Sequence, residues 1–445
     1  MDSYTGLRIR RTLLLVLALA LALGSLAVAA PAPARDRTGP AADDPVRALA
    51  RAARPLADLR PLEQAIGTAR IVGVGEATHN SREFFRFKHR LFQDLVERQG
   101  FTTFALEVNW SAGLRINDYV LHGKGDPVRI MREEFQNAYL IWNTREYLDL
   151  IRWMRQHNLR RPDRPVQFMG NDLAYAGPRL FDAVTAYADE RYPALAPQIA
   201  RLYRASRPTA GVDASIKAYT AKPLAERRAM AKDVRRALAL LEEQRPGPDR
   251  AEHAWVLQHA RAIAQTGTEF SYDFQDAGQV AEAMAYRDRS MAENTVWWQR
   301  QTGHRMLLSA HNGHVAYEAS DPAGDPKPQG AVLRELVGDA YTNIGFTFGQ
   351  GSFSAFDTSD PAEPLRRFEV GPPEKGSHEH TLERVARGDY YLDMRTAPPA
   401  ARAWLSVARP VRSIGGWPDA PEPLALTASY DVLVHLHRIT AADRL

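Results

Sequence analysis

The stretch that decides the fold is "RIVGVGEATHNSREFFRFKHRLFQDLVERQGFTTFALEV", residues 70–108. Short apolar runs at 70–75 and 102–108 are typical of buried strands. Between them, four apolar residues recur at the spacing of one helix face: Phe84, Phe87, Leu91 and Leu95. Asn80 is positioned to cap the start of this helix, with Glu83 as its capping-box partner. Gly100 is positioned to end the helix. The stretch therefore predicts one β-α-β unit.

Further short apolar runs extend this pattern along the chain. They lie at 165–170, 305–310, 343–348 and 430–436, and they indicate an α/β fold with a mostly parallel, buried sheet. Helical patterns occur at 225–244 and 279–303, and the region 178–265 is rich in Ala, Arg, Leu and Glu. We expect this region to be a helical insertion between two parts of the α/β core, 46–177 and 266–445. The Pro- and Gly-rich region 350–425 gives no clear pattern.

The N-terminus has the features of an export signal. A basic segment at 8–11 precedes the apolar run Thr12–Ala30, and small residues suit cleavage after Ala29. We expect a signal peptide over 1–29 and a flexible lead-in over 30–45. The alternative is an uncleaved membrane anchor, since 19 apolar residues nearly span a bilayer. An exported chain would place the protein in the periplasm or outside the cell.

Composition excludes several classes of function. The chain has no cysteine, which rules out disulfides, thiolate metal ligands and a Cys nucleophile. The net charge is only +4, so nothing indicates a nucleic-acid partner, or a membrane partner beyond the export signal. The chain has no G-x-S-x-G elbow, P-loop or H-E-x-x-H motif.

Polar residues follow four of the expected strands, at the point where each strand ends. In an open parallel sheet these ends share one edge, where ligands bind. The sequence therefore predicts a site at this edge. Its residues are Glu76, His79, Glu107, Asn171, Asp172, His311, Asn312 and His314.

Simpler interpretations exist for each of these residues. His79 and Glu76 could merely belong to a helix start, and Glu107 could form a structural ion pair. His311 and His314 flank an Asn-Gly pair that could be a plain turn. Lys88 and Arg287 lie on the helices next to the expected edge. Either could bind a carboxylate or an anionic intermediate, or lie on a solvated face.

The sequence resembles the erythromycin esterase family. The resemblance rests on "GEATHNSREFFRFKHRLFQDLVERQGFTTFALEVNW", "GND", "YRDRSMAENTVWW", "AHNGHV" and "YTNIGFTFGQG", in this order, and covers residue 65 to the end. It implies a three-layer α/β/α core interrupted by a helical insertion, and hydrolysis of a cyclic ester by activated water without a metal. Family members often have Gly where this chain has Asn80, and the macrolide-inactivating members have Arg where it has Lys88.

When the family's functional residues are carried over to the matching positions of this chain, the resemblance implies that His79 is the general base, held by Glu76 or Glu107. His311 would orient water or stabilise the oxyanion. The remaining candidates would bind substrate, a small-molecule ester or lactone: Lys88, Asn171, Asp172, Arg287, Asn312 and His314. A neutral imidazole suits the role of base, because histidine ordinarily titrates near pH 6.5.

Two alternatives remain open. Glu76, His79, Glu107 and His311 would also make a workable ligand set for a divalent cation in a metal-dependent hydrolase. The chain could instead be a non-enzymatic protein that binds haem or another small ligand on the same core. For haem, the conceivable ligands are Tyr119, Tyr139 and Tyr175.

Overall fold

The computed structural model of the chain describes residues 44–357, 365–418 and 420–445. The predicted signal peptide over 1–29 and nearly all of the lead-in lie outside these residues. Within the described part, no helix combines the length and the apolar composition needed to cross a membrane. The described residues divide into two compact units. We call residues 88–309 and 442–445 the helical unit, and residues 44–87 and 310–441 the strand-rich unit.

The helical unit contains three parallel strands in the order β5-β3-β4. Leu106 of β3 pairs with Gly170 of β4 on one side and with Ser309 of β5 on the other. The carboxyl ends of the three strands are thus in register. Their bounds are β3 (Phe101–Asn109), β4 (Gln167–Asp172) and β5 (Arg305–Ser309).

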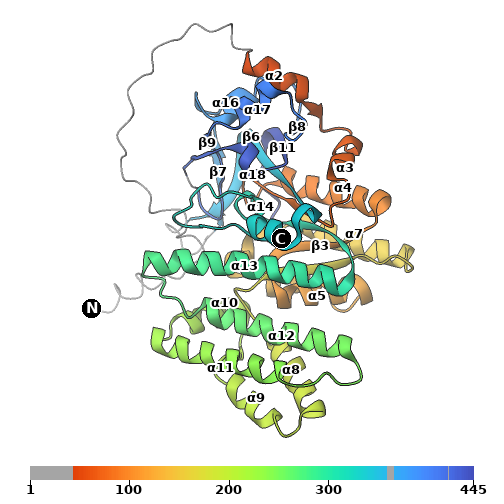
Figure 1. The fold of residues 1–445 in the computed structure, drawn as a ribbon, viewed down its shortest axis with the longest axis vertical. Coiled ribbons are helices and arrows are strands. Elements are labelled where there is room, and N and C mark those ends of the chain that lie inside the picture. The colour runs from red at the N-terminus through yellow and green to blue at the C-terminus, as the bar shows by residue number, and fades with distance from the viewer. Residues whose placement is uncertain (1–43, 358–364, 419) are drawn as a thin grey trace. The chain divides into compact units, whose positions relative to one another are not determined.

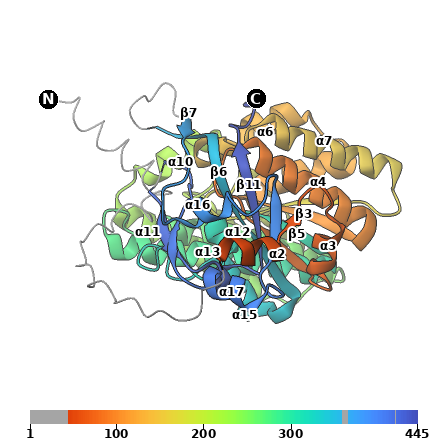
Figure 2. The same ribbon diagram turned by 90° about the horizontal axis from the view of Figure 1, so that it is seen from above.

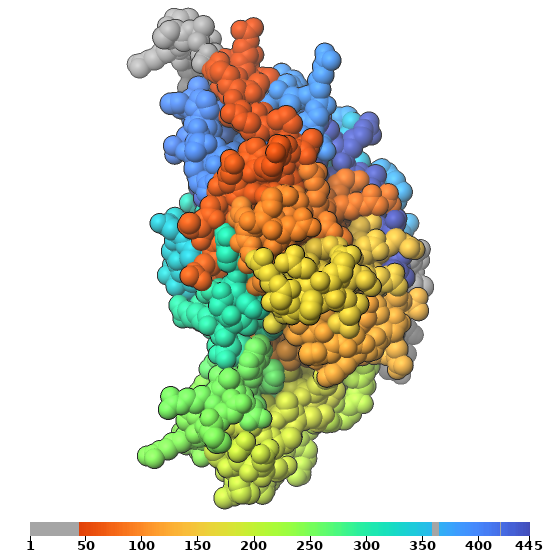
Figure 3. Space-filling model, turned by 90° about the vertical axis from the view of Figure 1, so that its right-hand side faces the viewer, coloured from red at the N-terminus to blue at the C-terminus, as the bar shows by residue number. Residues whose placement is uncertain are grey.

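Helices make up most of the rest of the helical unit. Four of them, α8, α9, α11 and α12, pack against one another (Figure 1) in the region predicted as an insertion. Part of α7 lies on the surface of the unit (yellow in Figure 3). The helices are α5 (Trp110–His122), α6 (Pro127–Glu134), the 3₁₀ helix η2 (Asn137–Trp142), α7 (Arg145–Arg160), α8 (Pro178–Arg191), α9 (Ala196–Tyr203), α10 (Val212–Thr220), α11 (Leu224–Glu242), α12 (Arg250–Glu269) and α13 (Ala277–Thr302).

The strand-rich unit has the strand order β1-β8-β11-β6-β2. Strands β2, β6 and β11 are parallel, whereas β8, β1 and β7 pair in antiparallel fashion. Figures 1 and 2 show β6 and β11 side by side. The strands are β1 (Arg54–Pro55), β2 (Ile71–Val74), β6 (Tyr341–Phe356), β7 (Leu365–Val370), β8 (Tyr390–Asp393), β9 (Arg409–Val411), β10 (Glu422–Leu424) and β11 (Val432–Ile439).

Short helices complete this unit and organise the region that the sequence left unassigned. Residues 350–425 contain the end of β6, strands β7 to β10 and helices α16 and α17. The helices are α2 (Pro45–Ala52), α3 (Arg60–Ile66), α14 (Asn312–Val315), α15 (Gln329–Val337), the 3₁₀ helix η3 (Gly338–Ala340), α16 (His378–Leu382), α17 (Pro399–Leu405) and α18 (Leu426–Ser429).

Most of the predicted elements are confirmed. All six expected strands are present, and the α/β class with mostly parallel strands holds. Helix α4 (Arg82–Gln99) buries its four predicted core residues, Phe84, Phe87, Leu91 and Leu95. Gly100 ends the helix with a φ of 69°, a conformation that glycine adopts without strain.

The predicted start of α4 is wrong. The helix begins at Arg82, so the capping position falls on Ser81 rather than Asn80. The carboxylate of Glu83 does not close a capping box, because it accepts hydrogen bonds from the backbone N–H and the hydroxyl of Thr440. The backbone carbonyl of Asn80 accepts from Ser354 of β6. Pairing with distant segments therefore overrides the local capping signal.

Candidate active site

The loop after β2 brings a carboxylate and an imidazole together. Glu76 is fully buried, and its Oε1 lies 2.9 Å from Nδ1 of His79. His79 is 8% exposed. A carboxylate bound to Nδ1 favours the tautomer with the proton on that nitrogen, which leaves the lone pair on Nε2. Glu76, one of the two carboxylates that the sequence offered as partners of His79, is hydrogen-bonded to it.

A second imidazole lies beside the first. The rings of His79 and His311 have centroids 4.8 Å apart and are tilted by 46°. The backbone N–H of Gly313 donates to Nδ1 of His311 over 3.2 Å. This nitrogen is therefore an acceptor, and in the neutral ring the proton is on Nε2. The two histidines thus have opposite tautomers, one suited to accept a proton and the other to donate a hydrogen bond.

Asn312 fixes the position of the His311 loop. Its side-chain amide donates to the carbonyl of Phe346 over 2.7 Å and accepts from the N–H of the same residue over 3.0 Å. Its backbone N–H donates to the carbonyl of Glu76 over 3.0 Å. Gly75 leaves room for this arrangement, because a Cβ there would lie 2.3 Å from Oδ1 of Asn312. His314 is also buried, on the same short helix α14.

In the helical unit a buried cation joins two of the predicted carboxylates. Arg287 of α13 is 4% exposed. Its Nε and Nη2 donate to the two oxygens of Asp172 over 3.0 and 2.8 Å, and Nη2 also donates to Glu107 over 2.8 Å. Burial opposes the charge, yet Asp172 and Glu107 hold the pKa of Arg287 well above its usual value. This ion network is a buried group at the ends of β3 and β4.

The other predicted residues of this unit are buried as well. Asn171 donates to the hydroxyl of Thr295 over 3.2 Å. Lys88 is fully buried on α4. The solvated-face interpretation of Lys88 and Arg287 is thus excluded, because neither side chain reaches the surface.

One ionisable residue near this network is not predicted by the sequence patterns. Glu269 ends α12, is 4% exposed, and has a buried Oε2 without a hydrogen-bond partner among the described residues. Burial raises the pKa of Glu269 to about 8; the nearby Arg287 opposes this, and the Asp172 charge adds to it. The only signal in the sequence is a carboxylate between apolar helical residues, which does not distinguish it from a surface glutamate.

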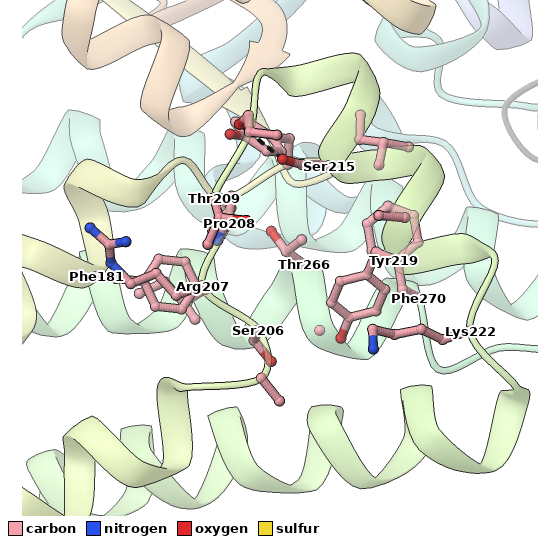
Figure 4. Close-up of a pocket in the computed structure, with 18 of the residues that line it drawn as sticks. Phe181, Ser206, Arg207, Pro208, Thr209, Ser215, Tyr219, Lys222, Thr266 and Phe270 are labelled. Carbon is pink, nitrogen blue, oxygen red and sulfur yellow. Dashed lines mark hydrogen bonds between the residues drawn. The ribbon is translucent and has the colours of Figure 1, made fainter.

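A cavity of about 210 Å³ lies within the helical unit. Figure 4 shows Tyr219 and Phe270 together on one side of it, with Ser206 and Arg207 on the chain segment after α9. None of the predicted site residues lines this cavity, although Tyr175 does. Of the other tyrosines considered as haem ligands, Tyr139 is buried and donates to Asp172 over 2.9 Å.

The predicted residues thus form two groups, each within one unit. One group contains Glu76, His79, His311, Asn312 and His314, and the other contains Lys88, Glu107, Asn171, Asp172 and Arg287. The first holds a carboxylate-bound imidazole and a second imidazole, which can move a proton and donate a hydrogen bond. The second holds buried charges in fixed positions.

Comparison with known proteins identifies similar chains. The family model described as erythromycin esterase matches residues 96–439. An erythromycin esterase type II from Escherichia coli is 24% identical over 77% of this chain and 84% of its own. A crystal structure named as a succinoglycan biosynthesis protein is 26% identical, with a TM-score of 0.78 over 91% of this chain and 98% of its own. The erythromycin esterase EreC, solved as a mutant in its open conformation, is 18% identical and shares the fold, with a TM-score of 0.67 over 87% of this chain and 96% of its own.

Proposed function

Because the chain belongs to the erythromycin esterase family of hydrolases, we propose that it cleaves a carboxylic ester or lactone by direct attack of water. The observation that carries this proposal is the hydrogen bond between Glu76 and His79, with His311 beside it. A base that is oriented by a buried carboxylate is the usual means of activating a weak nucleophile. No serine or cysteine motif is needed.

In the proposed reaction Nε2 of His79 takes a proton from water while the water oxygen bonds to the ester carbonyl carbon. Glu76 stabilises the imidazolium that forms, because its carboxylate is buried and already bonded to Nδ1. The Nε2–H of His311 is suited to donate to the developing oxyanion. The tetrahedral intermediate then collapses, the ester C–O bond breaks, and His79 returns its proton to the leaving alkoxide. The products are an acid and an alcohol, joined in one molecule when the substrate is a lactone.

The substrate is proposed by analogy with the relatives. The Escherichia coli relative is named an erythromycin esterase, so macrolide lactones belong in the first set of compounds to be tested. The other members of that set are smaller lactones and simple aryl esters.

The test is the turnover of this set by wild-type protein and His79→Ala. We expect kcat/KM to fall by about 10²–10⁴-fold, the usual contribution of a general base, with an unchanged circular dichroism spectrum. The matched control is His122→Ala, which removes an exposed imidazole and should leave turnover unaltered. Full activity in His79→Ala would refute the assignment of the base.

Two further measurements test the parts of the mechanism. Rapid mixing should show no burst of alcohol product, because no acyl-enzyme accumulates when water attacks directly. Turnover should survive dialysis against a chelator, and loss of turnover with recovery on adding a metal ion would favour the metal-dependent alternative.

We also propose that the chain is exported. The support is the basic and apolar N-terminal segment followed by small residues, as in secretory signals. Expression of the full chain followed by cell fractionation and N-terminal sequencing tests this. A mature N-terminus at Ala30 is expected, and an intact N-terminus in the membrane fraction would support the anchor instead.

A further inference from the structure

Three side chains of the strand-rich unit, none of them in the proposed hydrolytic site, form a compact cluster of metal-ligand type. His435 and His437 lie two residues apart on β11, so their side chains point to the same face of the strand. Glu383 follows the end of α16, which packs against β6. Its Oε1 lies 3.1 Å from Nε2 of His435, and its Oε2 lies 3.0 Å from Nδ1 of His437.

These distances are typical of hydrogen bonds. They also match the separation between neighbouring ligand atoms around a metal ion. A cation with imidazole and carboxylate ligands at about 2.1 Å has neighbouring ligand atoms about 3.0–3.4 Å apart at octahedral or tetrahedral angles. The three groups offer ligand atoms that all lie within 4.8 Å of one another. Only small side-chain shifts would be needed to surround an ion.

The charges around the cluster favour a cation. Asp389 adds negative charge near His435. The nearby Arg412 directs its guanidinium to the backbone carbonyls of residues 349, 371 and 372.

The surroundings hold these groups in place. The Nδ1 atom of His435 lies 2.9 Å from the hydroxyl of Thr347, the outer hydrogen bond that orients a metal-binding histidine. Gly349 of β6 leaves the space that the Glu383 carboxylate occupies, because a Cβ there would lie 1.8 Å from Oε1. The ring of Tyr390 packs against both imidazoles, with centroid distances of 5.4 and 6.4 Å. The cluster is therefore built into the fold.

The cluster is also accessible. The side chains of Glu383 and His437 are 25% and 20% exposed, whereas His435 is fully buried. Two imidazoles and one carboxylate leave coordination positions for water, as in His₂Glu zinc sites. We propose that Glu383, His435 and His437 form a binding site for one divalent transition-metal cation, with Zn²⁺ as the ion that best fits these ligands. The site is independent of the proposed hydrolysis.

The test is Zn²⁺ binding to the purified chain without a histidine tag, after treatment with a chelator. Titration calorimetry of wild-type protein should show one high-affinity site, and Co²⁺ in its place should give visible absorption bands typical of nitrogen ligands. Zn²⁺ should also raise the Tm of wild-type protein. Mg²⁺ should give neither effect, because it prefers oxygen ligands.

The variants locate the site. Glu383→Gln and His437→Ala should each weaken Zn²⁺ binding at least 10-fold and remove the rise in Tm, whereas His380→Ala, on the neighbouring helix, should bind as wild type does. Wild-type protein with less than one Zn²⁺ per chain at 100-fold excess ion would overturn the proposal, whatever the variants do. Binding that persists in the Glu383→Gln/His437→Ala double variant would overturn it as well.

Discussion

The buried network around Arg287 makes the sharpest prediction about stability. The change is Arg287→Ala, which removes three charge-assisted hydrogen bonds of 2.8–3.0 Å and leaves two carboxylates in a buried site. Asp172 keeps its bond from the hydroxyl of Tyr139. Glu107 is 2% exposed, so water cannot simply replace the lost cation.

The size of the loss follows from these contacts. Removing one partner of a buried ion pair costs about 3–5 kcal/mol, because the charge left behind has lost its compensation. Two carboxylates share this cation, so we expect a loss within that range. In a cooperative unit of about 150–250 residues, each kcal/mol lowers the Tm by about 2–4 °C, which gives a total fall of roughly 6–20 °C.

Differential scanning calorimetry and urea unfolding measure this loss. The matched control is Arg289→Ala on the same helix, whose side chain is half exposed and lies 3.9 Å from Glu293. Surface pairs of this kind contribute about 0–1 kcal/mol. Neutralising the network with Arg287→Met, Asp172→Asn and Glu107→Gln together should recover part of the loss. If Arg287→Ala costs no more than the control, the reasoning about buried charge is wrong.

Three further variants have defined outcomes. Burial raises the pKa of Glu269 from 4.5 to about 8, so the folded chain keeps a proton that the unfolded chain releases, and stability falls as pH rises through this window. Glu269→Gln has no such proton and does not lose stability in this way. The Tm of this variant relative to that of wild type should therefore increase between pH 5 and pH 8.5. Asn312→Ala leaves the buried N–H and carbonyl of Phe346 without their bonds to this side chain and should cost about 2–4 kcal/mol in urea unfolding. Lys88→Arg enlarges a fully buried side chain, and overpacking should lower stability by about 1–3 kcal/mol in the same assay; no change would mean that the site has spare room.

The sequence by itself determined the elements and the class of fold. The apolar runs and the period of α4 were sufficient, because both depend on local spacing along the chain. Polar residues at the strand ends could be predicted for the same reason, since parallel strands place their carboxyl ends on one edge. The start of α4 could not be predicted from the sequence, because Glu83 and Asn80 bond to segments more than 250 residues away.

The tertiary structure decided which of these residues act on one another. Three features depend on where side chains meet in space. They are the bond of Glu76 to His79, the opposite tautomer of His311, and the pairing of Arg287 with Asp172 and Glu107. The same holds for the buried Glu269 and for the cluster of Glu383 with His435 and His437. Residue types and spacings specify what a side chain can do, but burial and contacts between distant segments set its charge, its tautomer and its partner.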